Sequence, residues 1–97
     1  MTIEQLAQLE ERKREMTNKH KKILLIEDDH LLANTMLGML RDEQNTVDWL
    51  DDGQQALNAL LNDSFDLAIL DLTLPRVDGL DIVKKVRSQG IETPVII

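Results

Sequence analysis

Cysteine is absent from this chain, and other features that would assign it to a particular class are missing too. Without cysteine, neither a disulfide framework nor thiolate chemistry is available. No apolar run approaches the roughly 20 residues that a membrane span needs. The N-terminus carries alternating charges where a signal peptide would be apolar. These absences predict a reducing, cytoplasmic setting and no membrane partner.

Basic residues are scarce outside the N-terminal segment. Residues 1–22 hold six Lys or Arg against four Glu, whereas residues 23–97 hold five against fourteen acids. Nucleic-acid binding requires a basic surface that replaces condensed counterions. Residues 23–97 are therefore a poor candidate for contact with nucleic acid.

The length of 97 residues fits one domain with a core of modest size. Residues 1–20 are predicted to form a helical extension or linker, with a helix over residues 3–18 that Thr2 caps. Two interpretations of this extension stay open: a linker or coiled-coil segment, or a cover over part of the domain that follows. Residues 21–97 are predicted to form that domain.

Strands and helices alternate strictly along residues 21–97. Apolar runs predict strands over residues 23–26, 46–50 and 66–70, and a fourth that begins with Pro94-Val95-Ile96-Ile97. Strict alternation implies an α/β fold with a doubly wound parallel sheet and right-handed crossovers.

The helices between these strands have apolar residues at helical spacing. Aspartates stand at the predicted starts of the first two, where Asp29 and Asp52 are interpreted as caps. The third helix is predicted from about Leu80 to Ser88 and is stopped by Gly90. The residues expected to face inward from the first of these helices are Leu31, Leu32, Met36, Leu37 and Leu40.

Carboxylates follow two of the predicted strands directly. The first strand ends on Glu27-Asp28-Asp29 and the third on Asp71. Open α/β sheets bind ligands in the crevice at the carboxyl ends of their strands. If these two strands are parallel neighbours, their carboxylates meet there and repel each other unless a cation is present. The sequence therefore predicts a divalent-metal site in which Asp71 is the reactive or coordinating residue.

Two motifs together resemble the receiver domain of bacterial two-component response regulators, in particular regulators of transcription with a winged-helix output domain. They are Ile23-Leu24-Leu25-Ile26-Glu27-Asp28-Asp29 and Asp71-Leu72-Thr73-Leu74-Pro75-Arg76-Val77-Asp78-Gly79. The 43 positions from Asp28 to Asp71 are similar to the family's register. The resemblance implies a flavodoxin-like topology with strand order 2-1-3-4, in which the family's fifth strand is absent, plus an extra N-terminal helix.

The resemblance also implies a role for each matching residue. Asp71 corresponds to the nucleophile that accepts a phosphoryl group from a sensor histidine kinase. The residues that correspond to the Mg²⁺ ligands are Glu27, Asp28, Asp71 and the backbone carbonyl of Thr73. Mg²⁺ prefers such oxygen ligands in octahedral geometry. The implied chemistry is phosphoryl transfer without an independent enzymatic role.

The chain also departs from the family's pattern. Pro75 and Gly79 match the residues that shape the loop after the phosphoacceptor, but the family's later Ser or Thr and Lys fall beyond Ile97. The resemblance therefore implies a receiver truncated after its fourth strand, with impaired phosphorylation. The edge at Val95-Ile96-Ile97 is then expected to favour pairing with another chain, as a homo-oligomer or a domain-swapped dimer.

Two alternatives to the receiver are an assembly fragment and a metal-dependent phosphatase. An assembly fragment would self-associate through the exposed sheet edge, and its acidic crevice would be silent. A metal-dependent phosphatase of similar topology fits poorly, because its nucleophile begins a D-x-D motif whereas Asp71 is followed by Leu72-Thr73. Two further residues are interpreted as structural: His30 as a solvated surface residue and Trp49 as part of the core.

Overall fold

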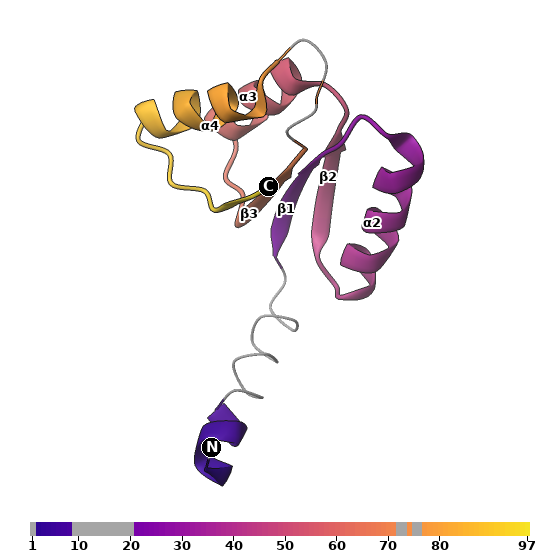
Figure 1. Ribbon diagram of the computed structural model, residues 1–97, viewed down its shortest axis with the longest axis vertical. Helices are drawn as coiled ribbons and strands as arrows, with labels where there is room; N and C mark the ends of the chain where they lie inside the picture. Colours follow the sequence, from indigo (N-terminus) through magenta and orange to yellow (C-terminus); the bar gives the residue numbers. More distant parts are fainter. Residues whose placement is uncertain (1, 9–20, 72–73, 75–76) are drawn as a thin grey trace.

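A computed structural model describes residues 2–8, 21–71, 74 and 77–97 (Figure 1). The body of the fold contains β1 (Lys22–Ile26), α2 (His30–Asp42), β2 (Thr46–Leu50), α3 (Gly53–Asn62), β3 (Leu67–Leu70), α4 (Gly79–Ser88) and β4 (Val95–Ile96). The strands pair in parallel in the order β2-β1-β3-β4. The predicted doubly wound sheet and its 2-1-3-4 order are therefore confirmed.

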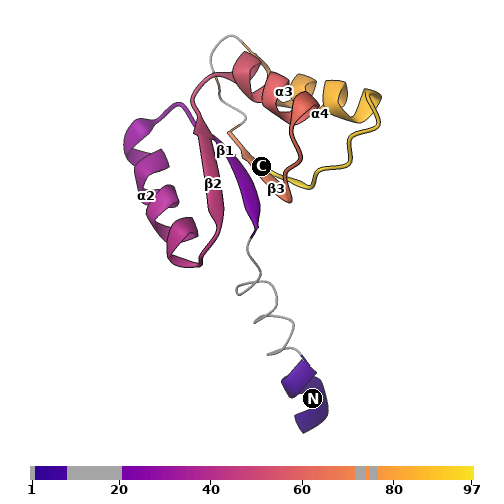
Figure 2. The same cartoon turned by 180° about the vertical axis from the view of Figure 1, so that it is seen from behind.

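The central strand β1 is covered on both faces, as its continuous apolar run predicts. Figures 1 and 2 show α2 on one side of the sheet and α3 with α4 on the other. The cluster on the α3 and α4 side contains Leu24, Ile26, Ala56, Leu60, Phe65, Ala68, Leu70, Leu74, Ile82 and Val86. The cluster on the α2 side contains Ile23, Leu25, Ala33, Leu37 and Val47. Alternate residues of β1 thus belong to different layers.

Each of the three helices in the body begins with an aspartate cap. The Asp29 and Asp52 carboxylates accept hydrogen bonds from the backbone N–H groups of Leu32 (3.1 Å) and Gln54 (3.4 Å). Both caps were predicted. Asp78 caps α4 in the same way, by accepting from Leu80 N–H at 2.9 Å, so α4 begins at Gly79, one residue earlier than predicted.

The inward face of α2 differs from the prediction. Leu31 and Leu32 are 80% and 47% exposed, whereas Ala33 and Leu37 are buried. Residues four positions apart share one helical face, and Ala33 and Leu37 set that face toward the sheet. Leu31 is two positions from Ala33 and therefore lies about 200° around the helix. The prediction that Leu31 and Leu32 face inward was wrong.

The N-terminal segment is helical over residues 3–8, and the remainder of the helix predicted over residues 3–18 lies outside the described residues. Thr2 caps this segment, because its Oγ1 accepts from Gln5 N–H at 3.1 Å while Gln5 Oε1 accepts from Thr2 N–H at 3.0 Å. Ile3 is 87% exposed. None of the helices in the described part of the chain has the length and apolar character to span a bilayer.

Candidate metal centre at the carboxyl edge of the sheet

Backbone pairing between strands brings the predicted carboxylates together. Strands β1 and β3 are neighbours with Ile26 opposite Leu70, and the Asp71 N–H donates to the Ile26 carbonyl at 3.0 Å. The Glu27 N–H donates to the Leu50 carbonyl of β2 at 3.1 Å. Both acids thus continue the backbone hydrogen bonding between strands just past the ends of their own strands. This places them together at the carboxyl ends of the strands.

Three carboxylates gather at this edge. One oxygen each of Glu27, Asp28 and Asp71 lie within 4.8 Å of one another. Glu27 is buried, Asp71 is half-buried and Asp28 is exposed. Three negative charges this close repel strongly, more so where burial reduces screening by solvent. The arrangement is therefore suited to a cation that enters from the solvent side.

Glu27 shows the electrostatic effect of this cluster. Burial raises the pKa of Glu27 above its ordinary value of 4.5, and its interactions with Asp71 and Asp28 raise it further. A hydrogen bond from the Asp29 N–H to Glu27 Oε1, 3.1 Å long, acts in the opposite direction and lowers the pKa. In the absence of a cation, the cluster thus retains a proton to a higher pH than an isolated glutamate would.

The donor set fits a hard divalent cation. Magnesium favours carboxylate and carbonyl oxygens, and proteins bind it through one or two carboxylates while waters complete the octahedron. Glu27, Asp28 and Asp71 supply oxygens only, and their negative charge attracts such an ion. Of the other predicted site residues, Thr73 and Pro75 lie outside the described residues. Gly79 is the buried first residue of α4.

Two neighbours of the acids have contacts that the sequence does not indicate. The Trp49 indole N–H donates to the Glu27 carbonyl at 2.9 Å. His30 is 65% exposed, yet its Nε2 lies 2.9 Å from Asp51 Oδ2 and its ring meets the Trp49 ring edge-on at 4.9 Å. A half-buried Trp usually finds an acceptor for its N–H, but sequence alone does not reveal which one.

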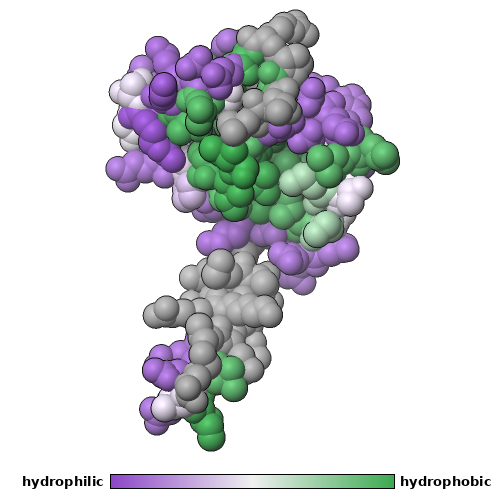
Figure 3. Space-filling model, viewed as in Figure 1, coloured by the Kyte–Doolittle hydropathy of each residue, from purple (hydrophilic) through white to green (hydrophobic). Residues whose placement is uncertain are grey.

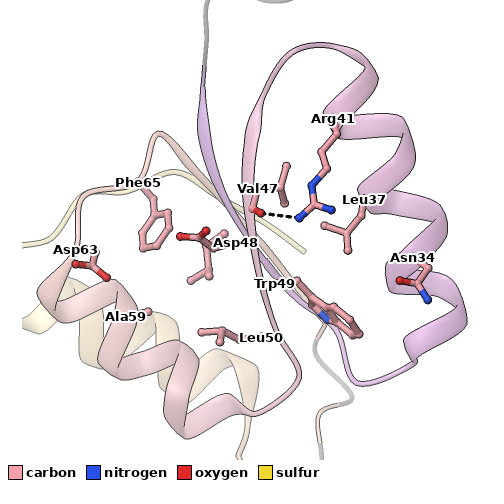
Figure 4. A pocket seen from close by; sticks show the side chains of 11 residues that line it. Asn34, Leu37, Arg41, Val47, Asp48, Trp49, Leu50, Ala59, Asp63 and Phe65 are labelled. Atoms are coloured by element: carbon pink, nitrogen blue, oxygen red, sulfur yellow. Dashed lines mark hydrogen bonds between the residues drawn. The ribbon is translucent and has the colours of Figure 1, made fainter.

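A cavity of about 690 Å³ opens along β2, with lining residues from α2 and α3 (Figure 4). Its lining includes Arg41, Asp48 and Phe65, but none of the three clustered acids. Arg41 Nη2 donates to the Val47 carbonyl at 3.2 Å across this opening. The three clustered acids therefore do not belong to this cavity.

Known proteins share both the sequence pattern and the fold. The sequence-family model of the response regulator receiver domain matches residues 23–97. Response regulator protein PmrA of Pseudomonas aeruginosa is 51% identical over 76 residues, which cover 78% of this chain and 34% of that protein. Transcriptional regulatory protein QseB of Haemophilus influenzae is 42% identical over 76 residues, which again cover 78% of this chain and 34% of that protein. The chain thus spans about a third of the length of these curated relatives.

Solved receiver structures superpose on the chain. The receiver domain of the Francisella response regulator 1452 matches with a TM-score of 0.76 and 29% identity, over 80% of this chain and 64% of that one. The receiver domain of the sensor histidine kinase PA1611 from Pseudomonas aeruginosa has a magnesium ion in its active-site cleft. It matches with a TM-score of 0.75 and 28% identity, over 79% of this chain and 65% of that one. The chain belongs to the response regulator receiver domain family.

Proposed function

We propose that residues 21–97 form a phosphoacceptor receiver module of a two-component phosphorelay, with residues 1–20 as an extension. In this proposal Asp71 accepts a phosphoryl group from a sensor histidine kinase. Glu27, Asp28, Asp71 and the Thr73 carbonyl hold Mg²⁺. The observation that carries the proposal is the convergence of three carboxylate oxygens within 4.8 Å at the carboxyl edge of a receiver fold.

The chemistry proposed for Asp71 is nucleophilic. A carboxylate oxygen of Asp71 attacks phosphorus in line with the N–P bond of the kinase phosphohistidine. That bond breaks, the histidine nitrogen keeps its electron pair and is then protonated, and an acyl phosphate forms on Asp71. Bound Mg²⁺ supplies charge neutralisation for the transferring phosphoryl oxygens. The chain needs no further enzymatic activity in this role, because it catalyses only its own phosphorylation and dephosphorylation.

The remainder of the proposal concerns a longer polypeptide. The relatives named above are response and transcriptional regulators, so we propose regulation of transcription as the output of the whole protein. A polypeptide of residues 1–97 taken alone does not contain the positions where the family places its Ser or Thr and its Lys. We expect phosphoryl transfer to that polypeptide to be slower than transfer to one that continues past Ile97.

The metal site is tested by titrating Mg²⁺ into the protein in a calorimeter. Asp28→Asn and Asp71→Asn each remove one charged ligand, and we expect each to weaken binding about tenfold or more. Asp63→Asn is the matched control, because it removes the same charge at the C-cap of α3, outside the acidic cluster. No binding to the wild-type protein, or equal weakening by Asp63→Asn, would contradict the proposal.

A second candidate function has one observation in its favour. Ile96 and Ile97 are 54% and 62% exposed, and β4 is an edge strand of the described sheet. In the view of Figure 3, apolar surface occupies the middle of the body of the fold. Such an edge favours self-association, which would make the chain an assembly module. Size-exclusion chromatography with and without Mg²⁺ tests this role, since an obligate dimer that Ile96→Lys dissociates would support it.

A further inference from the structure

Trp49 makes a directional contact with the acidic cluster. It is the only tryptophan of the chain and lies on β2, paired with Leu25 of β1. Its ring lies on the α2 side of β2, on the same side as Leu37 (Figure 4). From there its indole Nε1–H donates to the backbone carbonyl of Glu27 at 2.9 Å.

That carbonyl is the link between Glu27 and Asp28. A peptide unit is planar, so fixing the direction of the Glu27 carbonyl also fixes the position of the Asp28 Cα. The Glu27 N–H is already bound to the Leu50 carbonyl at 3.1 Å, and Glu27 Oε1 accepts from the Asp29 N–H at 3.1 Å. The Trp49 bond therefore adds a third anchor, and it acts on the peptide unit that leads to the exposed ligand Asp28.

The indole ring is itself held in place from the solvent side. His30 meets it edge-on, with ring centroids 4.9 Å apart and an interplanar angle of 85°. His30 Nε2 lies 2.9 Å from Asp51 Oδ2, just after β2. The ring is thus supported by His30, the first residue of α2, which directly follows the segment that carries Asp28 and Asp29.

We infer that Trp49 is a positioning residue for the metal site, which orients Asp28 through the Glu27 carbonyl; this inference rests on the proposed Mg²⁺ site. Apolar packing of Trp49 beside Val47 and Leu37 explains why the ring is half-buried. Packing has no directional requirement, however, and does not explain why the N–H points to a residue of the acidic cluster. Removal of the N–H alone therefore separates positioning from packing.

The decisive variant replaces Trp49 with 3-benzothienylalanine, which keeps the shape of the ring and has sulfur where indole has N–H. We expect Mg²⁺ affinity, measured by calorimetry, to fall about fivefold, the equivalent of one ordinary hydrogen bond. A second readout needs no metal, because we also expect the amide NMR signals of Asp28 and Asp29 to shift in the metal-free protein. Leu37→Ala is the control, since Leu37 is 7% exposed in the same cluster and is outside the acidic site.

Four outcomes decide the inference. A fivefold loss in the benzothienyl variant, with Mg²⁺ affinity within about twofold of wild type in Leu37→Ala, supports it. Unchanged affinity in the benzothienyl variant overturns the positioning role while the Mg²⁺ site stands. Equal losses in both variants indicate general loosening and also overturn it. No binding of Mg²⁺ to the wild-type protein overturns the proposed function, and the inference with it.

Discussion

Among the described residues, Glu27 is the one at which burial opposes charge most clearly. It is 7% exposed and shares the carboxyl edge with Asp28 and Asp71. A hydrogen bond between the Glu27 and Asp71 carboxyls contributes to its raised pKa. Two carboxyls can share a hydrogen bond only if one is protonated. Proton and cation therefore compete for the cluster, and Mg²⁺ affinity should rise with pH.

The raised pKa of Glu27 makes stability depend on pH in the metal-free protein. Between pH 4.5 and the raised pKa, the folded state keeps a proton that the unfolded state has lost. The contribution of Glu27 to the free energy of unfolding is therefore largest below pH 4.5 and falls as pH rises through this window. Glu27→Gln cannot ionise, so it should lack this contribution.

Urea unfolding in the presence of a chelator measures the effect. The difference in free energy of unfolding, wild type minus Glu27→Gln, should decrease as pH rises from 4 to 8. Carboxylates that do not interact with Glu27 titrate alike in both proteins, and their contributions cancel in this difference. A difference that stays constant across the range would show that the Glu27 pKa is not raised.

At the scale of elements, the start of helix α3 approaches Val77, which lies between Asp71 and α4. A Cβ built on Gly53, the first residue of α3, would lie 2.8 Å from the Val77 Cβ and 3.4 Å from Ile82 Cδ1. Val77 belongs to the segment between Asp71 and α4. The absence of a side chain at Gly53 therefore lets α3 and this segment pack closely.

Gly53→Ala should lower the free energy of unfolding by about 1–3 kcal/mol, because the overlap with Val77 forces a backbone shift. Gly38→Ala is the matched control, since nothing lies within 4 Å of its added Cβ. Inside a helix, Ala is more favourable than Gly by about 1 kcal/mol. Chemical denaturation measures both. Adding Val77→Gly should restore the stability lost in Gly53→Ala. Adding Val77→Ala should not, because alanine keeps the Cβ that clashes. Equal effects of the two Gly→Ala changes would contradict the close approach.

Helix α2 presents exposed leucines next to the acidic site. Leu31 is 80% exposed and follows the Asp29 cap by two residues. Leu31→Glu should slow phosphoryl transfer from a histidine kinase that phosphorylates the wild-type chain, because it places charge where a docked partner would bury an apolar side chain. Met39→Glu makes the same change late in α2, where Met39 is 67% exposed.

Comparison of phosphodonors isolates the docking effect of Leu31. We expect about a tenfold loss of kinase-dependent transfer in Leu31→Glu, as for an apolar contact of about 1.4 kcal/mol. Met39→Glu should accept the phosphoryl group from the kinase at the wild-type rate. Labelling by acetyl phosphate should be unchanged in both variants. Equal loss with both donors would mean that Leu31→Glu damages the site itself and would contradict a docking role.

For the whole molecule, the sequence predicts the layers better than the contacts between them. The unbroken apolar run of Ile23–Ile26 correctly predicts a strand covered on both faces, because such strands need no polar alternation. Apolar residues surround much of α2, so hydropathy alone did not reveal that Leu31 faces solvent. The bond from Trp49 to Glu27 spans 22 positions and depends on register and ring orientation. Such contacts exist only once the sheet is assembled.

In the candidate site too, the sequence predicts which elements meet but not the individual tertiary contacts. Strand order and the carboxyl-edge rule place Glu27, Asp28 and Asp71 together, and the structure brings these three together. Their roles as metal ligands and phosphoacceptor remain predictions, as does the role of the Thr73 carbonyl. The proximity of Gly53 to Val77 was not predicted, because no local pattern relates two segments that meet only in the tertiary fold.

The proposed function depends on one step, the transfer of a phosphoryl group to Asp71 with Mg²⁺ bound. The most direct measurement is prolonged exposure to acetyl phosphate, followed by borohydride reduction of any acyl phosphate and peptide mass spectrometry. Reduction converts a phosphorylated aspartate to homoserine and so identifies the residue. We expect homoserine at position 71 when Mg²⁺ is present, and none there when a chelator removes it. No homoserine at that position, homoserine at another aspartate, or labelling independent of Mg²⁺ would contradict it.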